Sequence, residues 1–285
     1  MIEQPQNTLK NPAKLEGVGL HSGSKVSLII NPAPEDYGIV FRRTDVENFD
    51  NFIRADYKNV TKTQLGTVIS NSQGTLISTI EHLMAALWGL GIDNALVDVS
   101  AAEVPIMDGS SDPFIAAIEA SGIKKQAANR KQVKVIKEVS VEEEDKFARI
   151  IPSDNFSIDL EIDFNSKAIP TQKRIYSDNT PFKDALGKAR TFGFAHEVDY
   201  LRSVGLARGG SLDNAIVIKD DKILNQDGLR YEDEFVRHKL LDCIGDFYLA
   251  GKRLIGGVKA YKTGHKLNNM LLHRLFSDKT AFEIV

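Results

Sequence analysis

The residues best suited to chemistry lie in one stretch, residues 234–246, which reads Glu-Phe-Val-Arg-His-Lys-Leu-Leu-Asp-Cys-Ile-Gly-Asp. On a helix, residues four apart share a face, so His238, Asp242 and Asp246 would form a row. An imidazole and a carboxylate one turn apart can bind the same small cation, and a further carboxylate could orient another group. The same spacing is also typical of the solvent-exposed face of an amphipathic helix. A second cluster elsewhere in the chain is needed to decide between these interpretations.

The adjacent pair Glu81 and His82 is a second candidate. In a metal hydrolase the histidine could be a ligand and the glutamate the base that takes a proton from water. The alternative is structural, because Ser78-x-x-Glu81 is a capping box in which the glutamate only bonds the backbone at a helix start. Ser78 and Thr79 can cap a helix that a glycine at position 89 or 91 would end. The HExxH pattern is absent, so this helix does not supply both histidines of a zinc site.

The first half of the chain is expected to be mainly strands joined by glycine- and proline-rich turns. Alternating apolar residues predict strands at 25–30, 38–43 and 94–100, and a short amphipathic helix is expected near 114–120. The glycine-rich loop 17–23 lacks the spacing of a phosphate-binding motif, and its His21 suits a loop residue better than a ligand. Turn residues explain most of the loop that holds Glu103 and Asp108, so the roles of these two acids stay open.

Residues 121–131 are polar and basic with no apolar period, which predicts a linker between two domains, 1–124 and 132–285. After this linker, strand-like runs at 133–143, 147–152 and 156–164 predict an antiparallel meander.

The later segments predict a short helix at 196–206, a strand at 214–218, a strand at 254–261 and a final helix from residue 264. The apolar residues of 194–219 are either ordinary packing or one wall of a slot for a long aliphatic chain. His265 follows a glycine at the start of the final helix, where it could take part in acid–base chemistry or simply lie on the surface.

A faint internal repeat connects the two candidate clusters. In each half, strands precede a helix with a histidine near its beginning, His82 or His238, and a strand and a second helix follow. We therefore predict an α+β fold of two similar α/β-sandwich halves, each a mainly antiparallel sheet packed on helices. The helices of the halves would face each other in the middle, giving β-α-α-β layers. Such packing would bring His82 close to His238 and Asp242, forming a candidate site with two histidines and one aspartate.

Composition restricts the class of protein. The 285 residues are 42% hydrophobic and 26% charged, as in a soluble globular protein, and the net charge of −3 argues against a nucleic-acid partner. The single cysteine excludes an internal disulfide and a cysteine-rich zinc site, so His, Asp or Glu must hold any metal. The first residues lack a signal pattern, and no apolar run approaches the length of a membrane span. The expected location is the cytoplasm.

Six segments, in the same order along the chain, resemble the motifs of the UDP-3-O-acyl-N-acetylglucosamine deacetylases, a bacterial family of lipid A biosynthesis. The likeness covers nearly the whole chain, and six ordered motifs are far more specific than any one of them. The segments are 16–23 (EGVGLHSG), 78–83 (STIEHL), 103–110 (EVPIMDGS), 190–194 (RTFGF), 237–242 (RHKLLD) and 264–269 (GHKLNN).

The resemblance implies a zinc-dependent amidase that releases acetate from the 2-amino group of the acylated sugar nucleotide, the committed step of lipid A biosynthesis. Iron could replace zinc in the cell. The resemblance implies a small-molecule substrate, no membrane segment and a monomeric protein. It also implies the following roles: zinc ligands His82, His238 and Asp242; general base Glu81; positively charged partner or general acid His265, held by Asp246; oxyanion contact Thr191; nucleotide-sugar contacts Phe192 and Lys239; and an acyl-chain passage near 194–218 that includes Leu201 and Ala215.

One segment departs from the family pattern. Leu65-Gly66-Thr67 has glycine where some members have cysteine near the metal, which we expect to affect binding of an inhibitory second metal or local packing. Two alternative functions remain: a metal hydrolase acting on another acylated sugar nucleotide, and a non-catalytic protein that binds a sugar nucleotide.

Overall fold

The computed structural model describes residues 4–164 and 166–285. The N-terminal half contains a five-stranded sheet, in which β4 runs parallel to β9 and the other neighbouring strands are antiparallel. In spatial order its strands are β2 (Ala13–Val18), β3 (Lys25–Pro32), β9 (Ala95–Val99), β4 (Ile39–Arg43) and β5 (Phe52–Arg54).

The C-terminal half contains a corresponding sheet, in which β14 runs parallel to β19. Its main path is β12 (Val139–Glu143), β13 (Lys146–Ile151), β19 (Arg253–Tyr261), β14 (Phe156–Ile162) and β15 (Gln172–Ser177). Two further strands, β11 (Gln132–Val135) and β20 (Phe282–Ile284), extend the sheet from the beginning of β19.

The two sheets have the same topology. Each path begins with an antiparallel pair, β2 and β3 or β12 and β13. The second strand of the pair lies antiparallel to a central strand from late in the half, β9 or β19. The central strand has a parallel neighbour, β4 or β14, which pairs antiparallel with β5 or β15. This match confirms the internal repeat and the predicted α+β fold.

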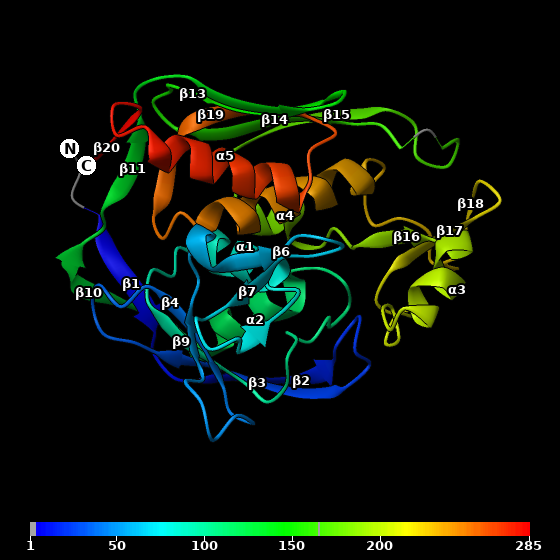
Figure 1. The fold of residues 1–285 in the computed structure, drawn as a ribbon, viewed down its shortest axis with the longest axis horizontal. Helices are drawn as coiled ribbons and strands as arrows, with labels where there is room; N and C mark the ends of the chain where they lie inside the picture. Colours follow the sequence, from blue (N-terminus) through cyan, green and yellow to red (C-terminus); the bar gives the residue numbers. More distant parts are fainter. Residues whose placement is uncertain (1–3, 165) are drawn as a thin grey trace.

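The helices of both halves lie between the sheets. Figure 1 shows the C-terminal sheet at the top, the N-terminal sheet at the bottom, and α5, α4, α1 and α2 between them. Their bounds are α1 (Glu81–Gly89), α2 (Asp112–Ser121), α4 (Glu234–Tyr248) and α5 (His265–Ser277). α1 packs against α4, and α4 against α5. The predicted β-α-α-β layers are therefore observed.

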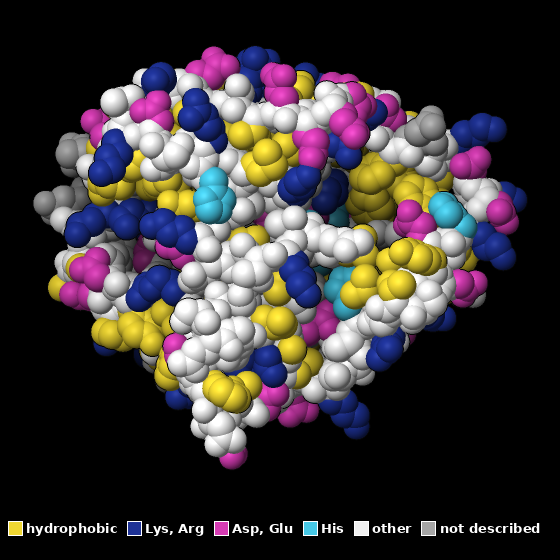
Figure 2. Space-filling model, in the orientation of Figure 1, with side chains coloured by type: hydrophobic (Ala, Val, Ile, Leu, Met, Phe, Trp, Pro, Cys, Tyr) yellow, Lys and Arg dark blue, Asp and Glu magenta, His cyan; other side chains and the backbone are white. Residues whose placement is uncertain are grey.

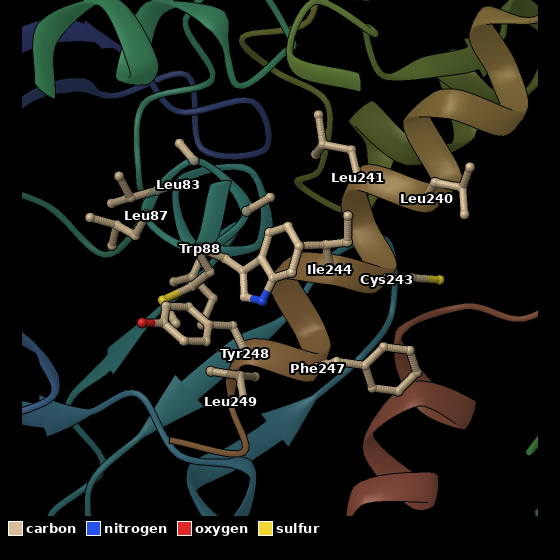
Figure 3. Close-up of a cluster of buried hydrophobic side chains, with 14 of the residues drawn as sticks. Leu83, Leu87, Trp88, Leu240, Leu241, Cys243, Ile244, Phe247, Tyr248 and Leu249 are labelled. Carbon is tan, nitrogen blue, oxygen red and sulfur yellow. The ribbon is translucent and has the colours of Figure 1, made fainter. Parts of the chain in front are cut away.

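The core between the layers explains the composition of α1. Every residue from Glu81 to Trp88 is buried, because this helix meets another layer on all sides. Figure 3 shows Trp88 of α1 pointing toward Ile244 of α4, while Leu83 and Leu87 lie on the opposite side of α1. α4 is also buried on nearly all sides, so the row of His238, Asp242 and Asp246 is not a solvent-exposed face.

Two smaller sheets lie beside the layers. The strands β6 (Val60–Lys62), β7 (Val68–Ser70) and β8 (Leu76–Ile77) precede α1. The insert consists of β16 (Phe192–Phe194), α3 (Ala195–Ser203), β17 (Ile216–Lys219) and β18 (Lys222–Ile223), and it projects to the right in Figure 1. The chain also contains two single turns, η1 (Tyr57–Asn59) and the π-helical η2 (Lys183–Gly187).

The polar segment 121–131 contains β10 (Ile123–Asn129), which pairs antiparallel with β1 (Pro5–Leu9). Backbone hydrogen bonds form this ribbon, and no apolar face is required. The predicted antiparallel meander is correct only for β12 and β13, which pair antiparallel. The rest of the prediction was wrong, because the run 133–143 is divided between β11 and β12, and β14 pairs with β15 and β19. The domain boundaries at 124 and 132 stay predictions.

Within the described ranges, no helix has both the length and the apolar character needed to cross a membrane.

Candidate metal centre and active site

Three side chains from the two halves converge where α1 crosses α4. The Nε2 atoms of His82 and His238 lie 3.5 and 3.4 Å from Asp242 Oδ1, and the two imidazole rings meet edge to face with centroids 4.9 Å apart. Gly245 permits this close crossing, because a Cβ there would lie 2.1 Å from the backbone oxygen of Glu81. The predicted grouping of these three residues is observed.

The donor atoms of this cluster suit a small divalent cation. One ligand atom from each of the three residues lies within 4.8 Å of the others. Asp242 Oδ1 is buried and has no hydrogen-bond partner among the described residues, an arrangement that costs free energy unless a cation binds there. Asp242 Oδ2 accepts a hydrogen bond from Lys239 Nζ at 2.7 Å. Two imidazole nitrogens and a carboxylate oxygen form a typical zinc donor set that leaves a fourth position open.

The surroundings of the cluster keep its atoms in the ligand form. His238 Nδ1 lies 3.1 Å from the carbonyl oxygen of Ala189, so Nδ1 carries the hydrogen and Nε2 keeps its lone pair. Burial lowers the pKa of His238 to about 3, so the imidazole is neutral. Burial by itself would raise the pKa of Asp242, but His238 and the Lys239 ammonium hold it well below its usual range.

Glu81 lies directly before His82, and its carboxylate does not cap the helix. Glu81 Oε2 accepts a hydrogen bond from the backbone N–H of Thr67 at 2.9 Å. The capping-box interpretation was wrong because Ile80 occupies the N-cap position, while Ser78 forms a bridge with Glu103 and its hydroxyl donates to Ala102. Burial raises the pKa of Glu81, which favours a carboxyl group that can accept and release a proton.

His265 is a further neighbour of Glu81 and is held by Asp246. His265 Nδ1 is 2.8 Å from Asp246 Oδ2, and His265 Nε2 is 4.0 Å from Glu81 Oε1. Burial disfavours the charged imidazole, but the carboxylates of Asp246 and Glu81 outweigh this effect and raise the pKa of His265 to about 9. A divalent cation at the neighbouring cluster would lower this pKa by repulsion.

Asp246 takes part in three hydrogen bonds, one of them with His265. Its Oδ2 also accepts from Asn268 Nδ2 at 2.8 Å, and its Oδ1 accepts from Thr67 Oγ1 at 2.6 Å. The side chain therefore has little freedom to rotate, which fixes the orientation of His265.

Thr191, Phe192 and Lys239 line the cavity that contains the cluster. The backbone N–H of Thr191 donates to the carbonyl oxygen of Gly109 at 2.8 Å, and a Cβ on Gly109 would lie 2.2 Å from the oxygen of Asn214. Only a glycine allows this close contact between the 103–110 segment and the insert. The ring of Phe192 packs edge to face on His238, with centroids 6.1 Å apart.

Two cavities meet at this site. The first, of about 580 Å³, is lined by Glu81, all three residues of the cluster, His265, and lysines that include Lys262 and Lys266. The second, of about 440 Å³, is lined mainly by apolar residues of the insert, Leu201 and Ala215 among them. Thr191 and Phe192 line both cavities. Figure 2 shows the surface hollowed between the body of the protein and the insert on the right.

The structure also places the residues whose roles were open. Glu103 is buried and accepts hydrogen bonds from the backbone of His21 and Ser22 and from the Thr79 hydroxyl, so it anchors the glycine-rich loop beside α1. His21 lies outside the cluster, and its Nε2 contacts the carbonyl oxygen of Leu65 at 3.2 Å.

Asp108 forms an ion pair with Arg230. Thr67, which contacts both Glu81 and Asp246, was not predicted, because nothing in its local pattern distinguishes it from other loop threonines.

Comparison with known proteins adds independent information. Residues 6–277 match the family model LpxC, described as UDP-3-O-acyl N-acetylglycosamine deacetylase. The chain is 51% identical over 283 residues to the UDP-3-O-acyl-N-acetylglucosamine deacetylase of Hahella chejuensis, a match that covers 98% of this chain and 93% of that protein.

Proposed function

This chain belongs to the UDP-3-O-acyl N-acetylglycosamine deacetylase family, and we propose that it hydrolyses the acetamide of UDP-3-O-acyl-N-acetylglucosamine to the free amine and acetate, in lipid A biosynthesis, with zinc held by His82, His238 and Asp242. The observation that carries this proposal is the convergence of these three residues beside Glu81 and His265, where a polar cavity meets an apolar one.

Zinc bound at this cluster would polarise the amide carbonyl and make water more acidic. The protein holds the ligands in place through Ala189 and Lys239, and Asp242 Oδ1 is the atom left for the cation. Iron(II) could bind the same donors, and metal analysis of the native protein decides between the two.

Glu81 would act as the general base. Thr67 holds Oε2 of its carboxylate, and Oε1, which faces His265 at 4.0 Å, would take the proton of the attacking water. As the C–O bond forms, Glu81 takes that proton. Protonated His265, held by Asp246, would then give a proton to the sugar nitrogen as the C–N bond breaks.

Thr191 would stabilise the negative charge that develops on the carbonyl oxygen, because it lines both cavities where they meet. Phe192 and Lys239 would contact the nucleotide-sugar part of the substrate in the first cavity. The lysines of that cavity, Lys262 and Lys266 among them, have the charge that a diphosphate requires.

The second cavity would hold the 3-O-acyl chain. Leu201 and Ala215 line it, and burial of each methylene contributes about 0.8 kcal/mol to binding. The acyl chain would therefore supply much of the binding free energy and the selectivity. We further propose that the protein acts as a cytoplasmic monomer.

The test measures release of acetate from the UDP-sugar with and without its 3-O-acyl chain, using the wild type and His238→Ala. We expect about one zinc ion per wild-type chain, loss of metal and activity in the variant, and a strong preference for the acylated substrate. Equal rates on both substrates would reject the acylated sugar nucleotide as the preferred substrate. A wild type that binds the UDP-sugar but neither holds metal nor releases acetate would be a binding protein.

A further inference from the structure

Thr67 connects the two residues proposed for proton transfer. It lies in the loop between β6 and β7, and only 2% of its surface is exposed. Its backbone N–H donates to Glu81 Oε2 at 2.9 Å, and its hydroxyl donates to Asp246 Oδ1 at 2.6 Å. Its carbonyl oxygen accepts from the backbone N–H of Ile80, the residue before Glu81.

In each of the two carboxylates, Thr67 binds one oxygen and the other oxygen faces His265. On Glu81, Oε2 is held by Thr67 and Oε1 faces the imidazole of His265. On Asp246, Oδ1 is held by Thr67, which leaves Oδ2 for His265 Nδ1 and for Asn268. Thr67 therefore fixes the rotation of both acids.

The connection also spans the two halves of the fold. Glu81 begins α1 in the N-terminal half, whereas Asp246 lies on α4 and His265 begins α5 in the C-terminal half. The hydrogen bond from Thr67 to Asp246, residues 179 positions apart, thus joins the loop that binds Glu81 to α4, whose Asp246 binds His265. Proton transfer is sensitive to such alignment, because donor and acceptor must lie within hydrogen-bond reach of the substrate at the same time.

We propose that Thr67 is a positioning residue for the deacetylation. The Thr67 hydroxyl fixes Asp246, which in turn fixes His265, and the Thr67 backbone N–H holds the Glu81 carboxylate. Thr67 thereby fixes His265 relative to Glu81. This inference rests on the proposed function. It assigns Thr67 no contact with the metal ligands, so it predicts an effect on turnover without an effect on metal content.

The test compares Thr67→Val, which removes the hydroxyl and keeps the shape, with Thr67→Ser, which restores a hydroxyl. Thr8→Val is the matched control, since Thr8 is 3% exposed, its hydroxyl makes two hydrogen bonds to the backbone, and it lines neither cavity. For all three variants, kcat, KM, zinc per chain and thermal unfolding are measured. The value of kcat is calculated from the concentration of folded protein that contains zinc.

We expect Thr67→Val to lower kcat by about 10- to 100-fold, because a small misalignment of catalytic groups reduces the rate by this order, with KM and zinc content unchanged. Thr67→Ser should recover most of this loss. Thr8→Val should lower thermal stability and leave kcat unchanged. In the metal-free Thr67→Val protein, the Nδ1 proton of His265 should exchange faster with solvent, as measured by NMR.

Wild-type kcat in Thr67→Val, an equal loss in the Val and Ser variants, or a loss that follows zinc content would each overturn the proposal. If Thr67→Val fails to fold, the serine variant together with the exchange of the His265 proton in Thr67→Ala takes its place. A wild type that releases no acetate from the acylated UDP-sugar refutes the proposed function instead, so the two failures are distinguishable.

Discussion

Asp246→Asn removes the negative charge beside His265 and preserves the size of the side chain. The pKa of His265 is raised from 6.5 to about 9 although burial opposes this, and Asp246 is the largest favourable cause. A rise of that size corresponds to about 3 kcal/mol in favour of the charged imidazole. We expect the pKa of His265 in the variant to fall to 6.5 or below, so that His265 is neutral at pH 8.

The same substitution should alter stability with a defined sign. Because the pKa of His265 is raised by folding, its stabilising contribution is complete below pH 6.5 and is lost as the pH rises through about 9. The deficit of Asp246→Asn in the free energy of unfolding should therefore be largest near pH 6 and should decrease above pH 9. A part independent of pH, about 1–3 kcal/mol, should remain, because asparagine cannot accept all three hydrogen bonds that Asp246 accepts.

The assay is an NMR titration of the imidazoles in the metal-free protein, with His265→Gln identifying the signal. Urea unfolding at pH 6 and above pH 9 gives the stability, and acetate release at pH 8 gives the activity. If His265 in Asp246→Asn still titrates near 9, or if the variant keeps wild-type turnover at pH 8, the reasoning about this pair is wrong.

Two further predictions concern the base and the acyl chain. Glu81→Gln keeps the hydrogen bond from Thr67 but cannot take the proton of water, so kcat should fall about 10²- to 10⁴-fold with zinc content unchanged. Steady-state kinetics and metal analysis check this, and near-normal turnover would contradict it. Ala215→Phe should fill part of the second cavity and reduce kcat/KM for a long-chain substrate about fourfold for each methylene displaced, from about 0.8 kcal/mol per methylene. The substrate without an acyl chain is the control, and an equal loss on both substrates would refute the placement of the chain.

Local patterns in the sequence determined much of the fold. The spacing of apolar residues predicted the helices that begin near Glu81, Glu234 and His265, and the strands that became β3, β9 and β19. The repeat of these elements predicted the two matching halves with their helices between the sheets. Since His82 and His238 each lie near the start of an inner helix, the repeat also predicted that the two imidazoles would meet.

Only the tertiary structure decided which contacts each polar group makes. The capping-box spacing of Ser78 and Glu81 is the same whether Glu81 bonds its own helix or, as observed, the distant backbone of Thr67. Likewise, the polar run around β10 becomes a strand because β1 lies beside it. Such partners are far away in the sequence, and hydrogen bonds between them leave no periodic pattern in it. For this reason the elements could be predicted from the sequence, while the network through Thr67 required the folded chain.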